Sequence, residues 1–255
     1  MNFIKTIIGS NPDYQKPTPI DSPYLEIAEF FYDTIQGEGI TLGQPAAFLR
    51  MQHCTQSCWW CDTTEVWRNG NPYTLEELFK LIESTELIQK LKTGQHLILT
   101  GGSPVKQQKN LTLFLHAFKE RYGFQPVVEI ENECTLMPTP EFSRLIDIWN
   151  NSPKLKHSGN PDKLRYKPDI LQYLSGLENS WFKFVISHKN DWDEIDASFL
   201  QPNLIKREQI ILMPLGSNRQ ELHKNREMVV ETAIRETVRY CTREQIELWD
   251  KTTGV

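Results

Sequence analysis

The chain has 255 residues and a formal net charge of −5, because 33 Asp and Glu residues outnumber 28 Lys and Arg residues. This length can bury a full core in one domain, and the acidic balance argues against electrostatic binding to nucleic acid. No apolar run approaches the roughly 18 residues of a membrane span, and the apolar core at the start is too short for a secretory signal. We therefore expect a cytoplasmic protein with neither a membrane nor a nucleic-acid partner.

The predicted strands follow an N-terminal segment of different composition. Residues 1–22 carry several Pro, Asp, Asn and Ser residues, so we expect an N-terminal extension there and one domain over residues 23–255. Apolar segments typical of strands then occur at 26–32, 45–52, 96–100, 126–131, 181–187 and 209–213.

Helical patterns lie between these segments, and three of them carry start signals. The signals are Thr74 with Glu77 before residues 75–91, Thr139 with Pro140 before 141–150, and Ser217 with Gln220 before 221–238. Strands that alternate with helices indicate βα units and a mainly parallel sheet. The strand count predicts an α/β barrel or part of one, with its site at the C-terminal ends of the strands.

Polar or potentially ligating residues follow three of the predicted strands. Cys54 follows the strand at 45–52, the sequence TGGSP at 100–104 ends the next, and Glu131 to Glu133 end the third. Gly101 and Gly102 would let the backbone come close to a ligand. Since the strand ends of a parallel sheet meet at one edge, we expect these groups to form one site.

The sequence HCTQSCWWCD contains three of the five cysteines, Cys54, Cys58 and Cys61. An odd number with a cluster of three fits a metal site better than disulfides. A structural zinc site needs a fourth ligand, for which the candidates are His53, Cys134 and Cys241. Three thiolates on a [4Fe–4S] cluster would instead leave one iron open, and an open iron can bind a small molecule through an amine and a carboxylate.

The pattern C-x3-C-x-aromatic-C, with Trp60 as the aromatic residue, resembles the signature of radical S-adenosylmethionine enzymes, whose fold is a partial (β/α)6-type barrel. The stretch FYDTIQGEGITLGQPAAFLRMQHCTQSCWWCDT is similar to the start of the 7-carboxy-7-deazaguanine synthase (QueE) family. Further similar pieces are TGGSP, SPK at 152–154, LMPLG at 212–216 and the ending IELWDKTTGV. The resemblance covers about residues 24–255.

This resemblance implies a specific reaction. S-adenosylmethionine would fill the fourth place on the cluster and would be cleaved by one electron to methionine and a 5′-deoxyadenosyl radical. The substrate would be 6-carboxy-5,6,7,8-tetrahydropterin and the product 7-carboxy-7-deazaguanine, formed by radical ring contraction with loss of ammonia in queuosine and 7-deazaguanine biosynthesis. The enzyme would be a carbon–nitrogen lyase. A flavodoxin or ferredoxin reductant and a homodimer are further expectations of the family.

The resemblance also implies roles for individual residues and assigns no catalytic side chain, because the radical would arise at the cluster. The cluster ligands would be Cys54, Cys58 and Cys61. The substrate contacts would be Ile35, Gln36, Gly37, Arg50 and Thr100. The S-adenosylmethionine contacts would be Trp60, Asp62, Gly102, Ser103, Ser152, Pro153, Lys154, Met213, Pro214, Leu215 and Gly216. Thr63 matches the family's Mg²⁺ ligand, and Asp62 competes with it because a carboxylate is the commoner ligand.

The chain departs from the family pattern at several places. Ser103 stands where Glu or Asn is common, Gln245 stands where relatives often have His, and no glycine occurs near Cys134. Neither the N-terminal extension nor the insertion HSGNPDKLRYKPDI at 157–170 has an assigned role.

Two rival functions remain open. A glycyl-radical activase shares the cysteine spacing, although it would lack the upstream DTIQGEG sequence. A zinc-stabilised binding module would have no catalytic activity. Iron and sulfide analysis of protein purified without oxygen would separate the zinc module from both enzymes.

Overall fold

A computed structural model describes residues 3–11 and 14–250 of the chain. Within these residues ten strands form one sheet in the order β1-β2-β3-β5-β6-β7-β8-β9-β10, with β4 paired to β2. The strands are β1 (Lys5–Ile8), β2 (Tyr24–Ile35), β3 (Pro45–Met51), β4 (Asn71–Thr74), β5 (His96–Gly101), β6 (Val128–Asn132), β7 (Ile148–Asn151), β8 (Ser180–Ile186), β9 (Ile210–Pro214) and β10 (Arg239–Tyr240).

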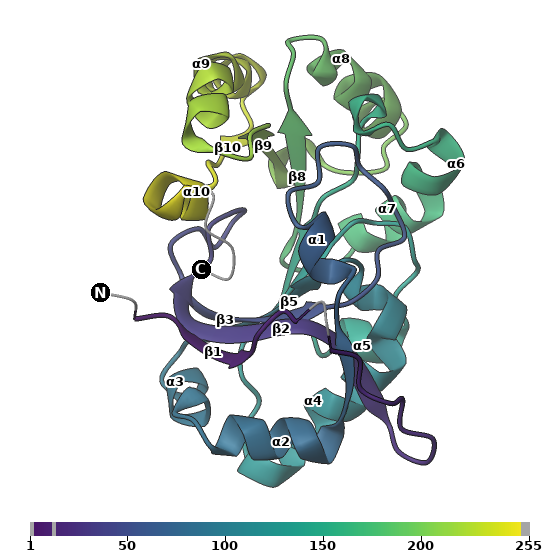
Figure 1. The fold of residues 1–255 in the computed structure, drawn as a ribbon. Helices are drawn as coiled ribbons and strands as arrows, with labels where there is room; N and C mark the ends of the chain where they lie inside the picture. Colours follow the sequence, from purple (N-terminus) through teal and green to yellow (C-terminus); the bar gives the residue numbers. More distant parts are fainter. Residues whose placement is uncertain (1–2, 12–13, 251–255) are drawn as a thin grey trace.

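The sheet is parallel over most of its width. Neighbouring strands from β3 to β10 pair in parallel, whereas β1, β3 and β4 each pair with β2 in antiparallel fashion. The sheet is open, because β1 and β10 are its two ends (Figure 1). The predicted α/β fold, a partial barrel with a mainly parallel sheet, is confirmed.

The helices connect successive strands and cover the sheet. Figure 1 shows α2, α3 and α4 together beneath β1, β2 and β3, and α6, α7 and α8 on the far side of the molecule from α9 and α10. The helices are α1 (Thr64–Trp67), α2 (Leu75–Glu83), α3 (Leu87–Lys92), α4 (Gln108–Tyr122), α5 (Pro140–Ser143), α6 (Asp162–Arg165), α7 (Pro168–Ser175), α8 (Asp191–Ile195), α9 (Arg219–Glu236) and α10 (Glu244–Trp249).

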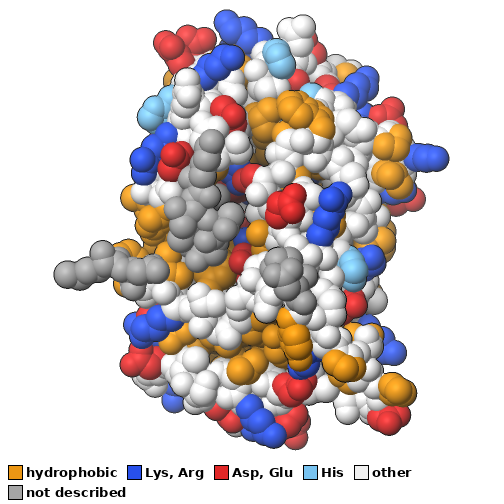
Figure 2. Space-filling model, viewed as in Figure 1, with side chains coloured by type: hydrophobic (Ala, Val, Ile, Leu, Met, Phe, Trp, Pro, Cys, Tyr) orange, Lys and Arg blue, Asp and Glu red, His pale blue; other side chains and the backbone are white. Residues whose placement is uncertain are grey.

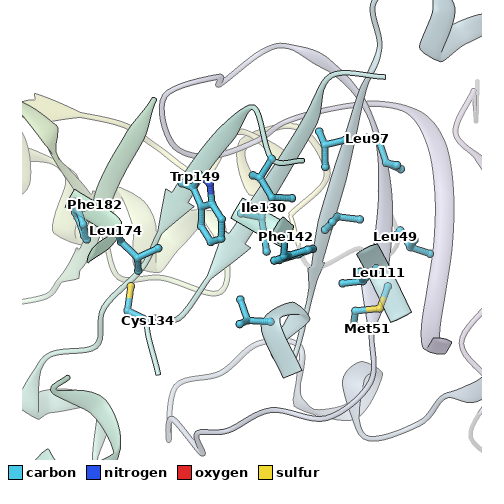
Figure 3. Close-up of a cluster of buried hydrophobic side chains, with 14 of the residues drawn as sticks. Leu49, Met51, Leu97, Leu111, Ile130, Cys134, Phe142, Trp149, Leu174 and Phe182 are labelled. Atoms are coloured by element: carbon cyan, nitrogen blue, oxygen red, sulfur yellow. The ribbon is translucent and has the colours of Figure 1, made fainter. Parts of the chain in front are cut away.

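The main apolar core lies between the sheet and its covering helices. Phe114 and Phe118 of α4 are fully buried, and the Phe114 ring stacks on Phe79 of α2 with 5.5 Å between ring centroids. Figure 3 shows Ile130 and Trp149, from neighbouring strands, within the same cluster. Burying an apolar side chain of this size contributes about 1.5–3 kcal/mol, so this layer fixes the sheet whose edge carries the site.

All six predicted strands form, but the predicted helices need correction. Thr74 and Glu77 make the expected capping box, yet the helix breaks after Glu83 and restarts as α3. Thr139 caps α5 as expected, but that helix ends at Ser143 and the residues after it form β7 rather than more helix. The cap of α9 is also one residue later than predicted, because Asn218 rather than Ser217 accepts the N–H of Glu221.

The N-terminal segment adds an edge strand to the sheet. Lys5 to Ile8 pair with β2, and Lys5 lies opposite Tyr32. Further along, the Lys16 ammonium contacts Glu77 at 2.9 Å and lies over the Tyr73 ring. Part of the predicted extension is therefore ordered against the domain.

Charged side chains of both signs are interspersed over the face shown in Figure 2, with hydrophobic side chains between them. This mixture agrees with the small negative net charge of the chain. Over the part of the chain that the structure describes, no helix has both the length and the apolar character to cross a membrane.

Candidate active site

A cavity of about 670 Å³ opens at the C-terminal edge of the parallel strands. The loop after β3, the glycines that end β5, the acidic residues that end β6 and the segment from Met213 to Ser217 at the end of β9 all line it. Parallel strands bring these segments together although they are far apart in sequence. The predicted convergence of three strand ends at one site is confirmed, and further strands contribute to it.

Three thiols line this cavity, and each sulfur has an N–H group within hydrogen-bond distance. The backbone N–H of Gln56 donates to Cys54 Sγ at 3.4 Å. The side-chain donors are Asn160 Nδ2, at 3.2 Å from Cys58 Sγ, and Trp67 Nε1, at 3.5 Å from Cys61 Sγ. N–H groups aimed at sulfur are the usual surroundings of iron–sulfur ligands. The three thiols therefore fit a cluster.

The two remaining cysteines are placed differently. Cys134 is buried in the main core, where Figure 3 shows it beside Leu174. Cys241 is buried in a smaller apolar cluster, and its sulfur accepts the N–H of Gly39 at 3.4 Å. Neither is among the residues that line the cavity. Among the described residues, no three His, Cys, Asp or Glu side chains are grouped so that they could hold a single metal ion.

The surroundings of the three thiols change their acidity unequally. Burial raises the pKa of Cys54 to about 11 and also raises the pKa of Cys58. Burial has the same effect at Cys61, but hydrogen bonds from Thr64 and Trp67 outweigh it, so the pKa of Cys61 is lowered overall. Positive charge on a bound metal would deprotonate all three thiols.

The two glycines at the end of β5 allow close packing against the cysteine loop. Gly101 has φ +126°, and a Cβ atom there would lie 2.2 Å from the Met51 carbonyl oxygen. A Cβ atom on Gly102 would lie 2.1 Å from the His53 carbonyl oxygen and 2.6 Å from the Cys54 nitrogen. The sequence predicted a close approach of the backbone to a ligand. The structure shows a close approach to the backbone that carries the first thiol.

The residues expected to bind substrate are held by carboxylates. Arg50 Nε contacts Glu29 Oε1 at 2.6 Å. The Thr100 hydroxyl donates to Glu131 Oε2 at 2.5 Å. Because a carboxylate fixes each of these side chains, both face the cavity in a defined orientation.

Gln36 is 1% exposed, and protein groups already satisfy its amide. Its Nε2 donates to Glu129 at 2.8 Å and lies 3.4 Å from Glu131, while its Oε1 accepts the N–H of Glu38 at 3.2 Å. The neighbouring residues Ile35 and Gly37 also line the cavity. The side chain of Gln36 thus positions the loop in this structure.

Most of the residues expected to contact S-adenosylmethionine lie together on one side of the cavity. Trp60 packs with an apolar cluster that includes Met213 and Leu215. Lys154 Nζ donates to the Ser152 hydroxyl at 2.8 Å and lies 5.7 Å from the Trp60 ring centroid. Of the residues in this group, Trp60, Asp62, Gly102, Ser152, Lys154, Met213, Pro214, Leu215 and Gly216 line the cavity.

Two of the expected contacts do not line the cavity. Ser103 is fully buried, and its hydroxyl donates to Glu133 Oε1 at 2.5 Å. Pro153 is also buried, within the turn that presents Ser152 and Lys154. The carboxylate that holds Ser103 is that of Glu133, which itself lines the cavity.

A buried charge network, which the sequence analysis missed, closes one side of the cavity. Glu38 contacts Lys183 Nζ through one carboxylate oxygen and Arg243 Nε, at 2.8 Å, through the other. Arg243 also reaches Asp62 at 2.5 Å and the Gly216 carbonyl at 2.7 Å. One guanidinium thus joins the IQGEG loop, the cysteine loop and the end of β9.

The network holds its members in their charged forms. Burial alone would raise the pKa of Glu38, but Lys183 and Arg243 keep this pKa well below its usual range. Burial alone would lower the pKa of Lys183, but Glu38 raises it to about 12. The Glu38–Lys183 contact therefore remains an ion pair at neutral pH.

Comparisons with known proteins agree with this site. The profile of a family described as a 4Fe-4S single cluster domain matches residues 35–134. The chain is 29% identical over 235 residues to the 7-carboxy-7-deazaguanine synthase of Pyrobaculum aerophilum, covering 91% of this chain and 98% of that protein. The enzyme of the same name from Halobacterium salinarum is 26% identical over 263 residues, covering 95% and 97%.

The crystal structure of QueE from Escherichia coli has the same fold, with a TM-score of 0.62 at 23% identity, over 87% of this chain and 94% of that one. The matched regions include the cysteine loop and the strand ends that form the cavity. Over nearly its whole length the chain is therefore similar to proteins named 7-carboxy-7-deazaguanine synthase, and residues 35–134 match a 4Fe-4S single cluster domain.

Proposed function

We propose that this chain is a 7-carboxy-7-deazaguanine synthase that converts 6-carboxy-5,6,7,8-tetrahydropterin to 7-carboxy-7-deazaguanine by radical ring contraction with loss of ammonia. The observation that carries the proposal is the set of three thiols, each with an N–H donor, on the wall of a cavity that also exposes Arg50. The similarity of the chain to 7-carboxy-7-deazaguanine synthases over most of its length supports the proposal.

Cys54, Cys58 and Cys61 would hold the cluster. When bound, a [4Fe–4S] cluster with one open iron supplies the electron for reductive cleavage of S-adenosylmethionine. The apolar surface of Trp60 and Met213 suits a flat adenine ring, and Glu133 offers a carboxylate to an ammonium group.

Arg50 would bind the substrate carboxylate by a charge-assisted hydrogen bond. Its Nε is occupied by Glu29, which leaves the outer nitrogens of the guanidinium for a second carboxylate. Thr100 and Glu131 would present a hydroxyl and a carboxylate to the pterin ring. Ile35 and Gly37 would contact the ring beside the engaged amide of Gln36.

Thr63 would bring Mg²⁺ to the substrate. Its hydroxyl lines the cavity and lies 3.7 Å from Cys61 Sγ, so a cation held there would be close to the cluster. Asp62, the competing ligand, already pairs with Arg243 at 2.5 Å. A neutral hydroxyl binds Mg²⁺ weakly, so waters and substrate oxygens would complete the six positions.

The remaining family expectations are part of this proposal. The electron donor would be a flavodoxin or a ferredoxin, and the enzyme would act as a homodimer in the cytoplasm. Residues 23–255 would form the catalytic domain and residues 1–22 its extension.

The direct test is turnover by protein reconstituted with iron and sulfide without oxygen. With S-adenosylmethionine, Mg²⁺, a chemical reductant and the carboxytetrahydropterin, we expect 7-carboxy-7-deazaguanine, identified by mass spectrometry. Cleavage of S-adenosylmethionine without this product would favour a different radical enzyme, such as a glycyl-radical activase. Protein that takes up zinc alone and has no activity would favour the binding module.

Arg50→Gln serves as a matched variant in this assay. Loss of one charge-assisted hydrogen bond should lower turnover by about 10- to 100-fold. Cleavage of S-adenosylmethionine in the absence of substrate should continue, because Arg50 would contact only the substrate. Complete loss of that cleavage, with fold and iron content intact, would count against the assignment of Arg50.

A further inference from the structure

The insertion at residues 157–170 packs directly against the cysteine loop. The backbone N–H of Trp59 donates to the Ser158 carbonyl at 3.2 Å, and the Trp59 indole N–H donates to the His157 carbonyl. Gly159 has φ +79°, and a Cβ atom on it would touch the Trp59 ring at 3.4 Å. The chain thus turns at Gly159 over the loop that carries the thiols.

Asn160, the next residue, is 7% exposed and uses both ends of its amide at the loop. Its Oδ1 accepts the backbone N–H of Ser57 at 2.9 Å. Its Nδ2 donates to Cys58 Sγ and to the Ser158 hydroxyl, each at 3.2 Å. The backbone N–H of Ser57 can only donate a hydrogen bond, so the Asn160 amide must turn its oxygen toward Ser57. Its NH₂ group then points toward the Cys58 sulfur.

The insertion is itself firmly anchored. Arg165 is 3% exposed, and its Nη1 lies 3.0 Å from the Lys154 carbonyl and 2.8 Å from Glu194. His157 Nε2 lies 3.0 Å from the Val185 carbonyl. Because the flanking residues are held at both ends, the Asn160 amide is held in place before any cluster binds.

We propose that Asn160 is a positioning residue that raises the reduction potential of the cluster by donating an N–H group to the Cys58 thiolate. The inference rests on the proposed function, because it requires a cluster on the three thiols. A reduced cluster carries one more negative charge than an oxidised cluster. A hydrogen bond to a ligand sulfur therefore stabilises the reduced form more and makes reduction easier.

Asn160 differs from the other two donors in its origin. The Gln56 N–H belongs to the cysteine loop, and Trp67 lies in α1 directly after it. Asn160 comes from about a hundred residues further along the chain. The insertion thus contributes a hydrogen-bond donor to a site whose ligands it does not supply.

The test is a redox titration of the full-length reconstituted protein, followed by the electron paramagnetic resonance signal of the reduced cluster, without S-adenosylmethionine. Asn160→Asp keeps the acceptor for Ser57 but lacks the N–H donor and adds a charge. Asn160→Leu has a similar size, is neutral and also lacks the donor. Ser158→Ala is the matched control, because it leaves the Asn160 amide between Ser57 and Cys58.

Both Asn160 variants should have a more negative potential than the parent, with unchanged iron content. The ratio of reduced to oxidised cluster at a fixed potential should fall by up to about tenfold, which is about 59 mV for a one-electron couple. Ser158→Ala should stay close to the parent.

Four results would overturn the inference. The first is an unchanged potential in both Asn160 variants, and the second is a shift in Asn160→Asp alone, which would reflect its added charge. The third is a shift in Ser158→Ala as large as that in Asn160→Leu, which would mean a general disturbance of the loop. The fourth is loss of iron from Asn160→Asp, which would mean that the residue holds the cluster rather than tunes it. A parent protein that forms no [4Fe–4S] cluster would instead refute the proposed function itself.

Discussion

Asp62 and Thr63 are adjacent in sequence, but their side chains have different surroundings. The Asp62 carboxylate is within 2.5 Å of Arg243, whereas the Thr63 hydroxyl faces the cavity and Cys61. A carboxylate that already has a guanidinium partner gains less from a cation than a free one does. The geometry therefore supports the hydroxyl as the contact to Mg²⁺.

Thr63→Ala should retain the cluster and the cleavage of S-adenosylmethionine, yet its turnover should no longer rise when Mg²⁺ is added. The reason is that the substitution removes the Thr63 hydroxyl, which is the oxygen proposed to hold the cation near the substrate. Thr63→Ser, which keeps the hydroxyl, is the matched control. If Thr63→Ala responds to Mg²⁺ like the parent while Asp62→Asn does not, the ligand has been misassigned.

At this scale the sequence predicted what lies in short motifs and missed what depends on distant partners. The three thiols occupy fixed places in one loop, so their spacing indicated a metal site, whereas Thr63 was proposed from its match to the family's Mg²⁺ ligand. Glu38 lies within the IQGEG sequence but had no predicted role, because its partners Lys183 and Arg243 are 145 and 205 residues away. No local pattern indicates such a pairing.

At the scale of elements, Arg243 acts as a clamp between three segments that line the cavity. It precedes α10 and contacts Glu38 after β2, Asp62 in the cysteine loop and Gly216 after β9. A planar guanidinium can hold three partners in fixed directions, which a lysine ammonium cannot do with the same geometry.

Arg243→Met should destabilise the protein by about 1.5–3 kcal/mol, because it removes charge-assisted hydrogen bonds to Glu38 and Asp62 while Lys183 still pairs with Glu38. The combination with Glu38→Gln should cost less than the sum of the two single changes, since the two residues interact directly. Urea unfolding of the parent, the two single variants and the double variant measures this coupling.

The control is Arg235→Met, which removes an exposed ion pair with Glu236 and should change the free energy of unfolding by less than about 1 kcal/mol. Additive effects of the Glu38 and Arg243 changes would contradict the clamp.

The elements that sequence reasoning missed lack local signals. Residues 148–150 were predicted to end a helix, but they lie in β7, which pairs in parallel between β6 and β8. Trp149 is buried in the core and Asn151 bonds to Ser180 and Asn132, so tertiary pairing overrides the helical pattern. Helix α4 was not predicted either, and its start has no side-chain cap to indicate it.

At the scale of the whole molecule, the open parallel sheet explains why one edge carries all of the chemistry. Its strands deliver the thiols, the glycines, the carboxylates and the segment after β9 to one cavity. The alternation of strands and helices in the sequence was enough to predict this arrangement. The insertion at 157–170 contacts the cysteine loop, and the segment that leads into α10 contacts the cavity wall. These contacts join residues far apart in sequence, so they could be identified only from the folded structure.

The central claim is that Cys54, Cys58 and Cys61 together hold one cluster while Cys134 and Cys241 hold none. The measurement is iron and sulfide per chain in the parent and in the five single Cys→Ala variants, all purified and reconstituted without oxygen. We predict about four irons and four sulfides per chain in the parent, in Cys134→Ala and in Cys241→Ala, with most of the iron and the brown colour lost from the other three variants. Zinc alone in the parent, or an equal loss of iron from Cys134→Ala or Cys241→Ala, would contradict the claim.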